Sequence, residues 1–264
     1  MVRNLGANKI LWLLTALLSL AAALVGVINT DIYSKVVTND IMPGVFGQDL
    51  MTIAASVIIL LLVFWMKEGD SKKQIVLLGI LGYLFYAYGI YVIERVYNLL
   101  YYLYLVVFAL SFWSIAYGVA RIRPDILQKA RVNGKIRHVS AWFSLLVAVI
   151  FNILWIVQLL PLLQAGNKIE NLYSVYILDL CFIMPAFVII GIMALRKAGL
   201  GLVLIPAMFI LGFTLIFSLA VAESVKPLFD LNITAGGLIP SLVLSILFLV
   251  LAFLHLRKLE FDKV

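Results

Sequence analysis

The sequence contains few charged residues and very few cysteines and histidines. Charged residues make up 12% of the 264 positions and hydrophobic residues 65%, and the mean hydropathy is +1.14. A chain of this composition has too little polar surface to fold as a soluble globule. Its single cysteine, Cys181, excludes an internal disulfide and a thiolate metal cluster, and its two histidines, His138 and His255, lie at the ends of apolar runs.

Catalytic motifs are also missing. The sequence contains no HExxH, no paired CxxC, no GxSxG and no Walker loop. Metalloproteases, thiol oxidoreductases, serine hydrolases and ATP-driven pumps therefore lack their usual signatures. We assign no catalytic residue and no metal ligand, and we expect no cofactor.

Long apolar runs dominate what remains. A spanning helix needs roughly 20 apolar residues to cross about 30 Å of hydrocarbon, and runs without period-two alternation favour helices over a barrel. The sequence therefore predicts an all-α fold, a polytopic transmembrane bundle of eight spans. The predicted spans are Ile10–Ile28, Leu50–Met66, Ile75–Ile93, Leu99–Val119, Val139–Leu160, Tyr173–Leu195, Gly201–Ala222 and Leu238–Leu256.

The first apolar run follows Arg3 and Lys9, as the core of a signal peptide would. It is longer than the usual core of about 7–15 residues, so we interpret it as a span.

The distribution of Lys and Arg predicts the orientation. With a cytoplasmic N-terminus, only four of the 20 Lys and Arg residues fall outside: Lys35, Arg95, Lys168 and Lys226. This positive-inside bias predicts a cell-membrane protein with both termini cytoplasmic. The net charge of +7 then reflects topology and not nucleic-acid binding. The basic loop "RIRPDILQKARVNGKIRH" is a topology determinant or a contact for anionic lipid headgroups.

An internal repeat is indicated by matches at an offset of 130 residues. Trp12 matches Trp142, Lys67 matches Lys197, and "ILGY" at 80–83 matches "ILGF" at 210–213. With four spans in each half, the halves would share one orientation, as in parallel transporter repeats. We therefore expect a first half at 1–125, a basic cytoplasmic linker at 126–138 and a second half at 139–264.

The repeat also pairs acidic residues. Asp49 matches Asp179, and Glu94 matches Glu223 one position out of register. Equivalent residues near an axis between halves approach each other. The repeat therefore predicts these four carboxyl groups around one outward-facing cleft.

Eight of the 12 tyrosines lie in the stretch "GYLFYAYGIYVIERVYNLLYYLYL". Tyr83 and Tyr86 share a helix face with Glu94, and Tyr83 lies about 16 Å deeper than Glu94. These two tyrosines line a pocket or bond a neighbouring helix. Tyr88 and Tyr91 point elsewhere, and Tyr97, Tyr101 and Tyr102 fit an interfacial aromatic belt.

The polar residues at membrane depth each have two interpretations. Asp179 lies about six residues into its span, where a carboxylate costs about 2.5–3.5 kcal/mol, so it faces a cavity or pairs with Arg95. Glu94 has the same two alternatives, and Asp49 is an N-cap or a site residue. Asn152 and Gln158 complete a polar lining or bond helices together. The candidate ligand-binding residues are Asp179, Glu94, Asp49, Tyr83, Tyr86, Arg95, Asn152, Gln158 and Glu223.

Three segments carry a family resemblance: "GQDLMTIAASVIILLL", "GILGYLFYAYGIYV" and "LDLCFIMPAFVIIGIMALRK". Together they resemble an uncharacterised family of prokaryotic multi-span integral membrane proteins. The likeness covers the second to fourth and the sixth and seventh spans. It implies the fold and two polar positions, Gln48–Leu50 and Asp179–Leu180 with Pro185, and it implies no substrate.

Carboxylates, tyrosines and amides facing outward suit a cation, a proton, an amine or a polar headgroup. The leading hypothesis is a transporter-like or ligand-binding membrane protein whose partners are membrane lipids and a small cationic or amine ligand. The alternatives are an intramembrane lipid-modifying enzyme that uses two carboxylates, and a non-catalytic subunit or assembly factor. The sequence leaves the oligomeric state open.

Overall fold

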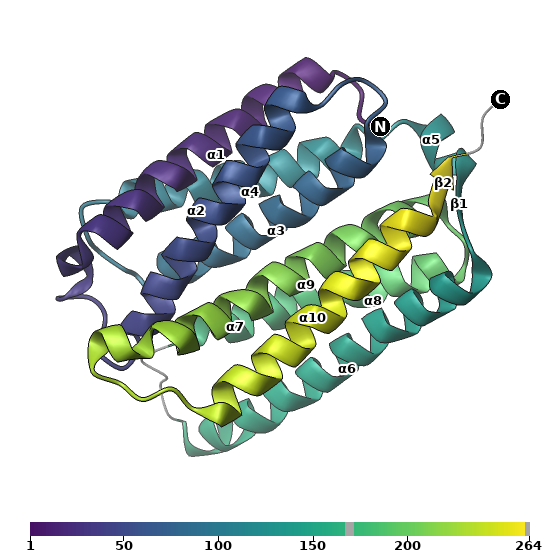
Figure 1. Cartoon of the computed structure of the whole chain (residues 1–264). Coiled ribbons are helices and arrows are strands. Elements are labelled where there is room, and N and C mark those ends of the chain that lie inside the picture. The colour runs from purple at the N-terminus through teal and green to yellow at the C-terminus, as the bar shows by residue number, and fades with distance from the viewer. Residues whose placement is uncertain (167–171, 262–264) are drawn as a thin grey trace.

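The computed structural model describes residues 1–166 and 172–261, and most of them are helical (Figure 1). Lys168 and Lys263, both used in the topology prediction, lie outside the described residues. The elements in chain order are α1 (Leu5–Ile28), η1 (Thr30–Tyr33), α2 (Met42–Trp65), α3 (Ser71–Ile93), α4 (Tyr101–Ala120), α5 (Pro124–Lys129), β1 (Ala130–Val132), α6 (Gly134–Ala165), α7 (Tyr173–Leu178), η2 (Asp179–Ile183), α8 (Met184–Leu195), α9 (Gly199–Val225), η3 (Lys226–Phe229), α10 (Ala235–Lys258) and β2 (Leu259–Phe261).

Eight helical spans among the described residues are long and apolar enough to cross a membrane, and one of them is formed by α7, η2 and α8 together. The predicted all-α bundle and its eight spans are therefore confirmed. The start of the second span is corrected, because α2 begins at Met42 and not at Leu50. Pro43 lies in the first turn of α2, where proline is well tolerated because the N–H that it lacks would have no partner within the helix. Asp49 consequently lies two turns inside α2 and is not its N-cap.

Helices α3 and α9 form the centre of the bundle and pack against each other. In the most apolar window of α3, 83% of the residues are buried, against 11% for α6, which faces outward. Gly79 of α3 allows the close approach, since a Cβ there would lie 2.6 Å from the carbonyl oxygen of Ala207. Small residues at such crossings are typical of helix packing in membranes.

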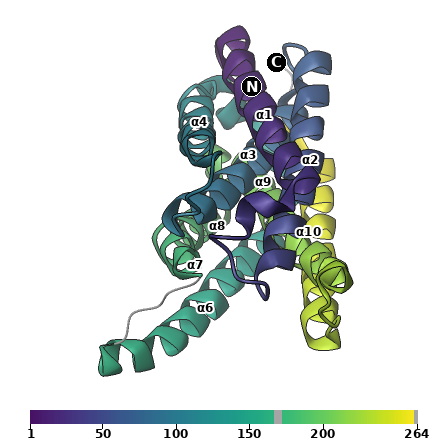
Figure 2. The same ribbon diagram turned by 90° about the vertical axis from the view of Figure 1, so that its left-hand side faces the viewer.

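The remaining helices form two groups on either side of this central pair. Figure 1 shows α1, α2 and α4 beside α3, and α6, α8 and α10 beside α9. The groups meet where α9 packs on α3 and α2, and where α7 packs on α3. Figure 2 shows the end of α6 well separated from the start of α10.

Both ends of the described chain lie at one end of the bundle, opposite η1 (Figure 1). There β1 pairs with β2 in antiparallel register, with Arg131 opposite Glu260. A further bridge joins Val2 to Ile122. The sequence did not predict this ribbon, because strands of three residues are too short to show an alternating pattern.

Candidate functional site

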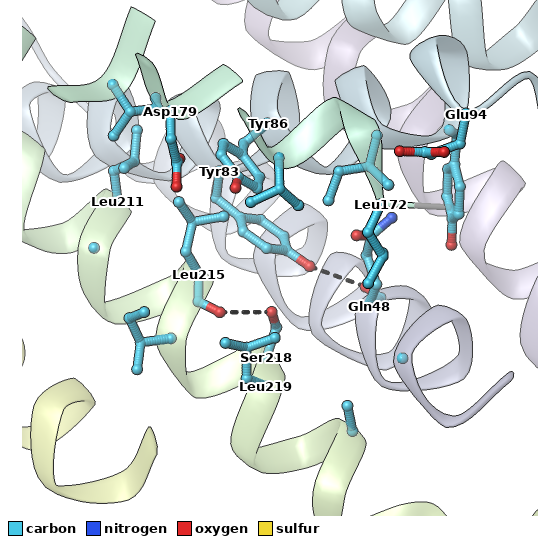
Figure 3. Close-up of a pocket in the computed structure, with 18 of the residues that line it drawn as sticks. Gln48, Tyr83, Tyr86, Glu94, Leu172, Asp179, Leu211, Leu215, Ser218 and Leu219 are labelled. Atoms are coloured by element: carbon cyan, nitrogen blue, oxygen red, sulfur yellow. Dashed lines mark hydrogen bonds between the residues drawn. The ribbon is translucent and has the colours of Figure 1, made fainter. Parts of the chain in front are cut away.

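A cavity of about 370 Å³ lies between the two helix groups and reaches from the η1 end to the middle of α9 and α10. Its volume falls within the range of small-molecule pockets, roughly 300–1,000 Å³, and its walls are mainly aliphatic and aromatic. Figure 3 shows Tyr83, Tyr86 and Asp179 pointing into this space. The polar or ionisable residues in its lining are Gln48, Tyr83, Tyr86, Tyr91, Glu94, Trp155, Asp179 and Ser218.

Asp179 sits on a wide helical turn. The amide of Met184 donates to the carbonyl oxygen of Asp179, five residues back, so η2 has π-helical geometry. Pro185 follows directly, and proline has no N–H and crowds the carbonyl four residues before it, which a wider turn relieves. Wide turns of this kind are frequent at functional sites. Here the turn presents the Asp179 carboxyl group to the cavity.

The carboxyl group of Asp179 is satisfied by neutral donors. Its Oδ2 accepts from Nε1 of Trp155 at 2.7 Å, and the residue is 5% exposed. The hydroxyl group of Tyr86 also approaches this carboxyl group (Figure 3). The alternative pairing with Arg95 does not form, because Arg95 is exposed and adopts a left-handed backbone conformation, with φ of 56°. Within the described ranges, no Lys or Arg makes an ion pair with Asp179.

Tyr83 combines the two roles left open for the deeper tyrosines. Its ring lines the cavity, and its hydroxyl group donates to the backbone oxygen of Gln48 at 2.9 Å (Figure 3). The bond joins α3 to α2. The cavity wall is therefore fixed in place by the same residue that lines it.

Glu94 lies at the η1 end of the cavity and caps a helix. Its Oε1 accepts from the backbone N–H of Ser174 at 2.6 Å, at the start of α7. Free N–H groups at a helix start favour a carboxylate. Glu223 serves α10 in a comparable way, because it accepts from the amide and hydroxyl of Thr234 and pairs with Lys226 at 2.7 Å. Of the two, only Glu94 lines the cavity.

Asp49 lies apart from the cavity, in a cluster of tyrosines. Its carboxyl group accepts from Tyr33 at 2.7 Å and from Tyr91 at 2.8 Å, and the residue is 1% exposed. It faces α1, where a Cβ on Gly26 would overlap its carboxyl group. Burial, followed by the nearby charge of Asp49, raises the pKa of Tyr33 above its ordinary value, so this hydroxyl group keeps its proton.

The expectation of one cleft shared by Asp49 and Asp179 is therefore wrong. Asp49 does not line the cavity and accepts from Tyr33 of η1 and Tyr91 of α3, whereas Asp179 lines the cavity and accepts from Trp155 of α6. Sequence equivalence identifies matching positions but leaves open the rotation of each helix about its own axis.

Asn152 and Gln158 also lie outside the cavity lining. Asn152 donates to the carbonyl oxygen of Ala148 in its own helix at 2.7 Å. Gln158 accepts from the hydroxyl group of Tyr176 at 3.1 Å, which joins α6 to α7. Gln158 thus has the helix-bonding role, and Asn152 has neither role.

Three residues of these clusters were missed from the sequence. One of them is Tyr91, which lines the cavity and donates to Asp49 although it was expected to point elsewhere. Trp155 supplies the donor to Asp179, and Tyr33 supplies one of the donors to Asp49. A tryptophan in mid-span carries an N–H that needs a partner when buried, which was the available signal for Trp155. Tyr33 lies in the short η1 segment between spans, where no periodicity indicates its direction.

No protein-family model, no curated protein and no solved structure matches the chain.

Proposed function

We propose that this chain is a cell-membrane protein that binds a small cationic or amine ligand with an apolar body and carries it as a transporter does. The observation that supports the proposal most strongly is the Asp179 carboxyl group, which lies in a mainly apolar cavity with no Lys or Arg paired to it among the described residues. A buried carboxylate is costly unless a counter-charge or donors compensate it. A ligand ammonium group would supply that charge.

The aromatic walls suit the same ligand. The rings of Tyr83, Tyr86 and Trp155 line the cavity around Asp179. A cation over such ring faces gains about 0.5–2 kcal/mol, and more when water is excluded. The aliphatic remainder of the wall would hold the apolar part of the ligand.

The two alternatives receive less support. A lipid-modifying enzyme with a carboxylate pair needs both acids in one site, but Asp49 is enclosed by tyrosines away from Asp179. A purely structural subunit would be expected to have a filled interior, and a cavity of about 370 Å³ fits that role poorly.

We also propose that the chain is a parallel repeat of two four-span halves. Shifting α3 by 130 residues gives 201–223, close to the bounds of α9 at Gly199–Val225. These two equivalent helices pack against each other in the centre. On this basis we expect the halves to superpose with Asp49 on Asp179.

The orientation can be tested with reporter fusions. Since the linker and the chain ends carry most of the Lys and Arg residues, we expect reporters within 121–138 and after Val264 to read cytoplasmic. A reporter inserted at Asp40, between η1 and α2, should read external. The cavity would then face the outside. A cytoplasmic signal from the reporter at Asp40 would show that the orientation is the opposite of the one proposed.

A thermal-shift screen tests the ligand class. We expect amines with a compact apolar group to raise the Tm of the purified protein in a saturable manner, because a ligand that binds only the folded state stabilises it. Alcohols and carboxylates of the same shape serve as controls and should have no effect. If no amine raises the Tm, the proposal fails.

A further inference from the structure

The surroundings of Asp49 consist of hydroxyl groups. α1 contributes the surface of Gly26, and η1, α3 and α4 contribute tyrosines. No Lys, Arg or His in the described part of the chain bonds to this carboxyl group. The titratable groups that face it are Tyr33, Tyr83, Tyr88, Tyr91 and Tyr104.

These surroundings act in opposite directions on the charge of Asp49. Burial favours the protonated form, whereas the two hydroxyl donors favour the ionised form. Among the residues that the structure describes, no Lys, Arg or His is paired with Asp49 in a way that would favour its ionised form. The group can therefore change its charge without breaking an ion pair.

A chain of hydrogen bonds joins Asp49 to the η1 end of the bundle. Nδ2 of Asn98 donates to the hydroxyl of Tyr104 at 3.1 Å, and Tyr104 donates to Tyr33 at 3.3 Å. Tyr33 then donates to Oδ2 of Asp49 at 2.7 Å. Asn98 is half-buried in the connection between α3 and α4. Every donor in this chain points toward the carboxyl group.

This order of donors is the one that delivers a proton. When a hydronium ion replaces the Asn98 amide, it gives a proton to the oxygen of Tyr104 and becomes water, and the original hydroxyl proton of Tyr104 passes to Tyr33. Tyr33 in turn passes its proton to Asp49. One proton is transferred in total, and both tyrosines end neutral.

Tyr91 connects the same carboxyl group to the cavity. Its hydroxyl group donates to Oδ1 of Asp49 at 2.8 Å, and its side chain lines the cavity. A ligand that moves Tyr91 would therefore change the hydrogen bond that stabilises the ionised form of Asp49.

We infer that Asp49 is an internal proton-binding site, filled through Tyr104 and Tyr33 and coupled to the cavity by Tyr91. The inference does not depend on which ligand the cavity takes. Proton uptake at Asp49 can be measured with the cavity empty.

Infrared difference spectroscopy of the full chain in lipid nanodiscs tests the site, with the C=O band of protonated carboxyl groups followed during a pH titration. We expect a band that titrates apart from the exposed carboxyl groups, vanishes in Asp49→Asn and persists in Asp179→Asn. If Asp49→Asn retains every band of the wild type, Asp49 does not bind a proton and the inference is overturned.

Tyr91→Phe provides a test that does not require Asp49→Asn to fold. Removing one of the two hydrogen-bond donors to the ionised Asp49 carboxylate should raise the midpoint pH of the band's titration by about 1 unit or more. Tyr88→Phe is the matched control, because Tyr88 donates to the carbonyl oxygen of Ser19 and not to Asp49. Equal midpoints in the two variants would overturn the coupling through Tyr91.

The route is tested by Tyr104→Phe, which keeps both donors to Asp49 but interrupts the chain. After a pH jump, we expect the band to respond at least about tenfold more slowly than in the wild type or in Tyr88→Phe. An unchanged rate would show that protons reach Asp49 by another path.

Discussion

Asp179→Asn is expected to remain folded and to lose the stabilisation by amines. Asparagine keeps the shape of the side chain and an oxygen that can accept from Nε1 of Trp155, but it carries no charge. Hydrogen bonds to charged groups contribute about 1.5–3 kcal/mol, so amine affinity should fall by a factor of about 10–100. Thermal-shift titrations of the purified variant with the amines that stabilise the wild type measure this loss.

Asp125→Asn is the matched control for this experiment. Asp125 lies at the opposite end of the bundle and pairs with Arg123 at 2.8 Å on the surface. The variant removes the same charge and should respond to amines as the wild type does. A second outcome would count against the proposal: if Asp179→Asn unfolds, Asp179 has a structural role, because the hydrogen bonds that its charged carboxyl group accepts from Trp155 and Tyr86 then stabilise the fold.

Gly47→Ala is expected to destabilise the protein. A Cβ at Gly47 of α2 would lie 2.7 Å from the backbone of Ala222 in α9, where the two helix groups meet. Since backbone atoms cannot move aside as a side chain can, α2 and α9 would have to separate. Overpacking of this kind costs about 1–3 kcal/mol. Unfolding by denaturant in detergent gives the change in stability.

Gly44→Ala, three residues earlier on α2, controls for the helix propensity of alanine. No atom lies within 4 Å of a Cβ at Gly44. The change should therefore be neutral or should stabilise α2 by up to about 1 kcal/mol. If both variants behave alike, the close contact with Ala222 is not what stabilises the interface.

The fold could be predicted from the sequence because each span must satisfy its backbone hydrogen bonds internally within the hydrocarbon. That requirement leaves a long apolar run for every helix, and Tyr173–Leu195 was predicted with the bounds that the structure has. The error at α2 came from "PGVFGQ", where Pro43 and two glycines resemble a loop. The β1–β2 ribbon depends on pairing across the whole chain, which local patterns do not encode.

The candidate site could be predicted from the sequence only in part. The helical period and the cost of a charge at depth pointed to Tyr83, Tyr86 and Asp179, and these three line the cavity. Trp155 and Tyr33 come from other elements, and their contacts depend on how helices rotate against one another. The same rotation separates Asp49 from Asp179, which the repeat alone had brought together.

The pairing of β1 with β2 and of Val2 with Ile122 has a mechanical consequence. Both ends of the described chain are tied by backbone bonds to the segment that joins the two helix groups. The ties lie at the end of the bundle away from η1, whereas the cavity reaches the η1 end. The end of the bundle that these backbone bonds hold together therefore acts as the hinge of any motion between the two helix groups. We expect the groups to separate most at the η1 end.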